Sequence, residues 1–146
     1  MTMRIGIGAD HGGYELKQEL VDGLRELKYV VDDVGTHNAD PSDFPDYGHI
    51  VARGVAARTY DRGILLDGTG IGMAIVANRY AGVRCANCAD VFSARYSRLH
   101  NDANVLALGG RVIGVGLAWE IVNVWLAAEF SGGDRHVRRL NKIEMR

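Results

Sequence analysis

One stretch of the sequence places an acidic residue directly before a glycine-rich loop: residues 63–78 read GILLDGTGIGMAIVAN. The apolar run before Asp67 is typical of a short buried strand, and the apolar run after the glycines is typical of a helix. A loop between a strand and a helix offers backbone N–H groups and the positive end of a helix dipole, which suit an anionic oxygen. The pattern therefore predicts a lone carboxylate beside a loop that could bind an anion.

The loop GTGIG, residues 68–72, matches neither of the common nucleotide-binding motifs. It lacks the Gly-Lys-Ser/Thr ending of a Walker loop, and Met73 stands where the dinucleotide fingerprint has its third glycine. Glycines that only turn the chain tightly are the alternative interpretation. The loop by itself does not decide between anion binding and a tight turn.

Other residues have side chains that could take part in chemistry at such a loop. Asp10 and His11 precede a predicted helix, although Asp10 could equally be a helix cap. His100 lies at the end of a predicted helix and could relay a proton, although a lone histidine is more often structural. Arg135 and Arg139 are four residues apart, so one helix face would present two guanidinium groups to a phosphate. The alternative for this pair is a solvated surface.

Strand-like and helix-like segments alternate along the chain and would position these residues. We expect strands at 3–10, 29–35, 62–67, 82–89 and 103–109, and helices at 13–27, 47–59, 72–80, 91–101 and 116–130. Strict alternation predicts an α/β fold, in which a five-stranded parallel sheet has helices on both faces. Ligands bind beyond the carboxyl ends of such strands. We therefore expect Asp10, Asp67 and Arg111 at that edge, together with His100 and the arginine pair.

The last segment, residues 134–146, is strongly basic but carries apolar residues at helical spacing. A solvated helix needs no apolar stripe, so a tail exposed to water would not need Val137, Leu140 and Ile143. We expect this C-terminal helical arm to pack on something, and a partner subunit is the candidate.

Length and charge limit the function further. The 146 residues fit one domain, 1–146, with no interior linker, and 17 basic against 18 acidic residues give a net charge of −1. No overall field would attract nucleic acid or an anionic membrane. No segment approaches the roughly 18 apolar residues of a membrane span, and the first residues do not read as a signal peptide. We expect a cytoplasmic protein that binds neither nucleic acid nor membrane.

The two cysteines, Cys85 and Cys88, form the motif CANC. In a strand, residues three apart face opposite sides, so the sulfurs would not meet. A structural zinc site would need a second pair of ligands. We interpret both as small buried apolar residues, and we expect no metal site.

Six motifs carry a resemblance to a known family along nearly the whole chain: GADHGGYELK (8–17), GT (35–36), FPDYG (44–48), GILLDGTGIGMAIVANRYAGVR (63–84), SRLHNDANVLALGGRVIG (97–114) and RHVRRLNKIE (135–144). The sequence resembles the ribose-5-phosphate isomerase B family, which includes the galactose-6-phosphate isomerase subunits. The resemblance implies a Rossmann-like three-layer αβα sandwich and metal-free, cofactor-free aldose–ketose isomerisation of phosphorylated sugars. It also implies a homodimer, sometimes paired into tetramers, with its sites at the subunit interface.

The resemblance implies roles for individual residues. Asp67 stands where the common bacterial branch has its catalytic cysteine, and Met73 stands where a second branch has a glutamate. Thr69 and the loop amides would stabilise the enediolate, and His100 would open the furanose ring. The implied substrate-binding residues are Asp10, His11, Gly68, Gly70, Ile71, Gly72, Asn101, Arg111, Arg135 and Arg139.

The carboxylate in place of cysteine leaves three hypotheses. Asp67 is the base that interconverts ribose 5-phosphate and ribulose 5-phosphate; or it marks a subgroup with another base or another substrate, such as a hexose 6-phosphate or tetrose 4-phosphate; or the protein binds sugar phosphates without turnover. We prefer the first, because the acid, oxyanion and phosphate groups are retained. Loop amides favour a charged carboxylate, so we expect a lowered pKa for Asp67 unless closure over substrate dries the site.

Overall fold

A computed structural model describes residues 2–144, in which strands and helices alternate as predicted. The strands are β1 (Arg4–Ala9), β2 (Val30–Asp33), β3 (Arg62–Asp67), β4 (Cys85–Asn87) and β5 (Val105–Gly109). The helices are α1 (Tyr14–Glu26), α2 (Phe44–Ala56), α3 (Ile71–Ala77), α4 (Val91–Leu99), α5 (Val115–Ala127) and α6 (Asp134–Asn141). The last two residues of the expected arm, 145–146, lie outside the described residues.

The five strands form one sheet in the order β2-β1-β3-β5-β4, and every neighbouring pair is parallel. This confirms the predicted α/β fold. The fourth strand is shorter than the expected 82–89, because the chain is still turning at Gly82, whose φ is +82°. Strand β3 lies in the middle of the sheet, so the residue that ends it lies at the centre of the carboxyl edge.

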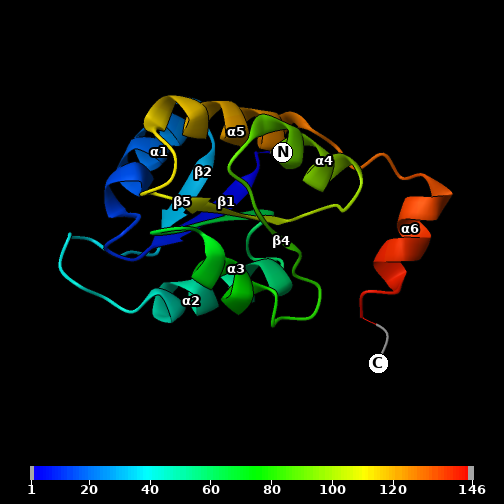
Figure 1. Cartoon of the computed structure of the whole chain (residues 1–146), viewed down its shortest axis with the longest axis horizontal. Helices are drawn as coiled ribbons and strands as arrows, with labels where there is room; N and C mark the ends of the chain where they lie inside the picture. The colour runs from blue at the N-terminus through cyan, green and yellow to red at the C-terminus, as the bar shows by residue number, and fades with distance from the viewer. Residues whose placement is uncertain (1, 145–146) are drawn as a thin grey trace.

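Helices cover both faces of the sheet (Figure 1). Helices α1, α4 and α5 pack on one face, and α2 and α3 pack on the other. Successive side chains of β3 point to opposite faces, so Ile64 and Leu66 belong to the first core and Leu65 to the second. Burial on both faces explains why the strands read as continuous apolar runs.

Helix α6 stands beside the layered body, on the opposite side from the loop 34–43 (Figure 1). Of its apolar residues, Val137 is 39% exposed, and Ile143 just beyond the helix is 57% exposed. The predicted helix is therefore present, but its apolar stripe is largely uncovered within one chain. Among residues 2–144, no helix is both long and apolar enough to cross a lipid bilayer.

Lys17 makes a buried ion pair that holds the end of β2. Its side chain is fully buried, and its Nζ donates to Asp33 Oδ1 at 2.6 Å and to Gln18 Oε1 at 3.0 Å. Asp33 Oδ1 also accepts from the Gly35 amide at 3.0 Å, at the start of the loop that leads to α2. The pair therefore ties α1 to this loop.

We expect Lys17→Met to lower the free energy of unfolding by about 3 kcal/mol, because it leaves the Asp33 carboxylate in a mostly buried position without its cation. Urea denaturation followed by circular dichroism measures the change. Lys28→Met, at an exposed lysine just beyond α1, is the matched control and should be nearly neutral. Equal effects of the two substitutions would contradict this assignment.

Candidate active site

Asp67 is the last residue of β3, and it is only 5% exposed. Its Oδ1 accepts a hydrogen bond from the Gly70 amide, and its Oδ2 accepts from the Met73 amide at 3.3 Å. Gly70 has a φ of +86°, a conformation that favours glycine, and a Cβ there would collide with Asn87. The glycine loop therefore folds back onto the carboxylate that precedes it.

Burial raises the pKa of Asp67 above its ordinary value. The nearby Asp10 carboxylate acts in the same direction, while the amides of Gly70 and Met73 act against it and do not outweigh burial. The expectation that loop amides would lower this pKa is wrong, because removal of water from the end of the central strand has the larger effect. A raised pKa makes Asp67 a stronger base once it is deprotonated.

The loop around Asp67 leaves little room. A Cβ at Gly72 would lie 2.8 Å from Asp67 Oδ2 and 2.8 Å from the Phe44 ring. Thr69 is exposed, and its Oγ1 accepts from the Ile71 amide at 3.2 Å. The amides of Gly70 and Ile71 are thus already bonded within the loop. Both would have to exchange partners to bind an enediolate, as the family resemblance implies that they do.

Asp10 and His11 follow β1 at the same edge of the sheet. Asp10 is 7% exposed, and its Oδ1 accepts from the Gly12 amide at 2.8 Å. His11 is paired with Ser42: its Nδ1 accepts from the Ser42 amide at 3.1 Å, and its own amide donates to Ser42 Oγ at 3.2 Å. A neutral His11 therefore carries its proton on Nε2, which is free to donate to an anion. Sequence reasoning missed Ser42, because a serine in a long loop shows no pattern.

Arg111 follows β5 and lies over the glycine loop. A Cβ at Gly68 would be 3.7 Å from Arg111 Nη1, and the Arg111 amide donates to the Gly68 carbonyl at 3.0 Å. The predicted residues at the carboxyl edge are therefore together in one chain. They are Asp10, His11, Asp67, Gly68, Thr69, Gly70, Ile71, Gly72 and Arg111.

Four of the predicted residues lie at the opposite edge of the sheet. They are His100, Asn101, Arg135 and Arg139. Helix α4 begins at the carboxyl end of β4 and returns the chain to the amino end of β5, so His100 lies at the edge of the sheet where β5 begins. The strand pairs Gly63–Val105 and Asp67–Gly109 mark the two edges, about 13 Å apart at about 3.3 Å per residue. The expectation that His100 and the arginine pair would lie at the same edge of the sheet as Asp67 is wrong.

A stack of aromatic rings links α4 to α6. The His100 ring lies 4.3 Å from the His136 ring with 13° between their planes, and 4.9 Å from the Tyr96 ring. Burial lowers the pKa of His136, and the neighbouring His100, Arg135 and Arg139 lower it further. His136 is 7% exposed, whereas the two arginines are exposed. His136 is not among the predicted site residues, although its spacing of four residues from Leu140 puts both on one helix face.

Both cysteines are free. Cys88 is buried, and burial raises the pKa of its thiol to about 11; Cys85 is partly covered, and burial raises the pKa of its thiol as well. Such thiols are poor nucleophiles, which agrees with their interpretation as small apolar residues. Within residues 2–144, no three His, Cys, Asp or Glu side chains form a group that could hold a metal ion.

Known proteins match this chain along nearly its whole length. A family model described as Ribose/Galactose Isomerase matches residues 5–143. Ribose-5-phosphate isomerase B of Escherichia coli is 46% identical, over 96% of this chain and 93% of its own. The D-erythrulose-4-phosphate isomerase of Pectobacterium atrosepticum is 44% identical, over 90% of this chain and 87% of its own.

Solved structures agree with the sequence matches. Ribose-5-phosphate isomerase B of Clostridium thermocellum superposes with a TM-score of 0.95 and 53% identity, and the match covers 97% of this chain and 95% of that one. The resemblance carried by the six motifs is thereby confirmed. With its parallel sheet, its glycine loop and these matches, the chain belongs to the ribose/galactose isomerase family and is a sugar-phosphate isomerase.

Proposed function

We propose that the protein interconverts ribose 5-phosphate and ribulose 5-phosphate through a cis-enediolate, with Asp67 as the base. The observation that carries the proposal is the buried Asp67 carboxylate, whose pKa is raised, at the mouth of the glycine loop. Its relatives in Escherichia coli and Clostridium thermocellum are named ribose-5-phosphate isomerase B, which favours the pentose phosphate as substrate.

The proposed reaction needs one proton acceptor that also returns the proton. In the open-chain aldose, Asp67 takes the proton from C2, the C–H electron pair forms the C1–C2 double bond, and charge moves to O1. The carboxyl group then gives the proton to C1, and the O2 proton moves to O1, which leaves the ketone at C2. Triosephosphate isomerase uses a glutamate in this way. In this proposal the Thr69 hydroxyl donates a hydrogen bond to the oxygen that becomes charged.

Phosphate binding would draw on both edges of the sheet. His11 Nε2–H and the Arg111 guanidinium are available at the edge that holds Asp67. Arg135 and Arg139 are exposed on α6 at the other edge, where two guanidinium forks suit a phosphate monoester. One site can use both sets only if they come from two chains.

We therefore propose a homodimer in which each protomer completes the other's site. The α6 arm and residues 100–101 of one protomer would lie over the glycine loop of its partner. The exposed Val137 and Ile143 support this proposal, because an apolar stripe on a basic helix needs a surface to cover it.

The experiment that tests the function is proton exchange followed by NMR in heavy water. The protein is incubated separately with ribose 5-phosphate, allose 6-phosphate, galactose 6-phosphate and erythrose 4-phosphate. Deuterium at C2 of ribose 5-phosphate, or at C1 of the ribulose 5-phosphate formed from it, is the expected result. Tight binding without exchange for all four sugars would favour a protein that binds without turnover.

A tetrose 4-phosphate is the second candidate substrate. The relative named D-erythrulose-4-phosphate isomerase is almost as similar to this chain as the Escherichia coli protein. In the exchange experiment, faster labelling of erythrose 4-phosphate than of ribose 5-phosphate would reassign the substrate and leave the chemistry unchanged.

We expect kcat/KM to show an acid limb set by Asp67 and lying above the ordinary aspartate value of 3.8. The base works when it is deprotonated, so activity is lost as the pH falls through the raised pKa. Asp67→Cys should move the limb upward, since an ordinary thiol titrates at about 8.5. Rate measurements from pH 4 to 9 on both proteins make the comparison. A limb at the same pH in both proteins would belong to another group, such as the substrate phosphate.

A further inference from the structure

At the edge of the sheet opposite Asp67, polar contacts hold the turn that follows α4. We propose that Arg84 is a positioning residue: it fixes residues 100–102, and with them His100, in the geometry that opening of the sugar ring requires. The proposal rests on the proposed function, because it needs a furanose substrate on which His100 acts.

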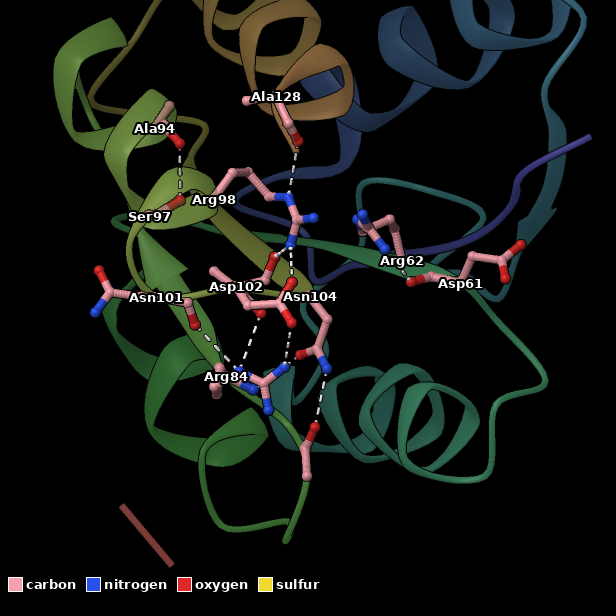
Figure 2. Close-up of polar contacts among 12 residues, drawn as sticks. Asp61, Arg62, Arg84, Ala94, Ser97, Arg98, Asn101, Asp102, Asn104 and Ala128 are labelled. Carbon is pink, nitrogen blue, oxygen red and sulfur yellow. Dashed lines mark hydrogen bonds and ion pairs between the residues drawn. The ribbon is translucent and has the colours of Figure 1, made fainter. Parts of the chain in front are cut away.

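Arg84 lies just before β4, and its guanidinium reaches the turn directly (Figure 2). Its Nε donates to the main-chain carbonyls of Asn101 at 3.2 Å and Asp102 at 3.0 Å, and its Nη2 lies 3.4 Å from Asp102 Oδ2. The Arg84 backbone is fixed as well: its amide donates to Asn104 Oδ1 at 2.8 Å, and its carbonyl accepts from the Asn104 amide at 3.0 Å. Arg84 thus holds the turn from a strand end whose own backbone is hydrogen-bonded to Asn104.

Asp102 connects Arg84 to a second, buried arginine (Figure 2). Its Oδ1 accepts from Arg98 Nη1 at 2.8 Å, and the same Nη1 donates to the Ala103 carbonyl at 2.7 Å. Arg98 is 3% exposed, and its Nε donates to the Ala128 carbonyl at the end of α5 at 3.2 Å. The turn is therefore held between a strand end and a helix end.

The backbone of the turn needs this support. Asp102 has a φ of +46°, in the left-handed region that costs free energy for a residue with a Cβ. Such a conformation persists only where the surroundings fix it. Arg84 Nε donates two of the hydrogen bonds that fix this turn, to the carbonyls of Asn101 and Asp102. His100 directly precedes Asn101 in the chain. Loss of Arg84 would let the turn relax and move His100.

The chemistry separates ring opening from proton transfer at carbon. Ribose 5-phosphate is a furanose, in which C1 is bonded to O4. Ring opening removes the proton from the C1 hydroxyl, breaks the C1–O4 bond and protonates O4, which leaves an aldehyde at C1. Ribulose 5-phosphate cannot close a furanose, because the oxygen on its C5 carries the phosphate. Exchange of its C1 proton therefore needs Asp67 but no ring opening.

The test compares two rates in the full-length protein. Arg84→Met should lower the rate of ribose 5-phosphate isomerisation by about 10- to 100-fold, since a displacement of about 1 Å of a catalytic group can cost 10²-fold. The rate of deuterium entry at C1 of ribulose 5-phosphate should change by less than about threefold. Arg84→Lys, which keeps the charge and one donor, should recover part of the isomerisation rate.

Arg62→Met is the matched control. Arg62 lies beside the cluster formed by Arg84, Arg98 and Asp102 (Figure 2). Its Nη1 donates instead to the carbonyl of its own neighbour, Asp61, at 2.9 Å. Its replacement should leave the ratio of the two rates unchanged. A similar shift of that ratio in Arg62→Met would overturn the proposal, because it would show a general effect of the cluster.

An equal loss of both rates, or no loss of either, in folded Arg84→Met would also overturn the positioning role. If Arg84→Met does not fold, the same ratio in Arg84→Lys decides the question. The wild-type protein is measured first. If it exchanges deuterium with neither sugar, the proposed function fails, and the positioning role fails with it. A loss confined to ring opening in the variant can therefore not be confused with absence of the reaction.

Discussion

Replacing Asp67 by asparagine is expected to lower kcat for ribose 5-phosphate by about 10³-fold, the middle of the usual range for loss of a general base, and to leave KM within about threefold. Asparagine has nearly the same shape and keeps a carbonyl oxygen to accept the Gly70 amide. It has no group that takes a proton from carbon. Steady-state rates and deuterium exchange with ribulose 5-phosphate should fall together, because both reactions pass through the enediolate.

Asp67→Cys is the matched variant, because it restores a group that can take a proton at the same place. The loop amides of Gly70 and Met73 would offset part of the burial that disfavours a thiolate there, so we expect measurable activity above neutral pH. An asparagine variant that isomerises ribose 5-phosphate at the normal rate would show that another group is the base.

Much of the fold could be predicted from the sequence, because two-sided burial leaves a clear pattern. The run before Asp67 is apolar at every position, as a strand covered on both faces must be, and β3 ends where the pattern ends. The fourth strand was predicted too long, because Gly82 and its neighbours read as apolar while the backbone still turns there. Local pattern gives the type of an element more reliably than its ends.

The candidate site could be predicted only in part, and His100 illustrates the reason. The rule that ligands bind beyond strand ends holds for residues that follow a strand, and it placed Asp10, Asp67 and Arg111 correctly. His100 follows a helix, and in a parallel sheet each helix returns the chain to the opposite edge. The raised pKa of Asp67 could not be predicted for a different reason. The loop amides can be inferred from the sequence, but the burial that outweighs them is a property of the packed fold.

The division of site residues between two edges makes mixed dimers the most informative test of the proposed assembly. One chain carries Asp67→Asn, and a second chain carries both His100→Asn and Arg139→Ala. Each homodimer should be nearly inactive, because every site in it lacks either the base or the groups for ring opening and phosphate binding. In a mixed dimer, one site receives Asp67 from the second chain and His100 and Arg139 from the first. That site is intact.

Random mixing of equal amounts makes half of all twofold-symmetric dimers mixed, and each mixed dimer has one intact site of two, so about a quarter of wild-type activity should return. The measurement is ribose 5-phosphate isomerisation after the two inactive chains are unfolded together and refolded. The control is the same treatment of each chain alone, which should recover almost nothing. Inactive mixed dimers would mean that each protomer builds its site from its own residues. In that case α6 and the turn at His100 would have to cross about 13 Å of sheet to reach Asp67 in the same chain.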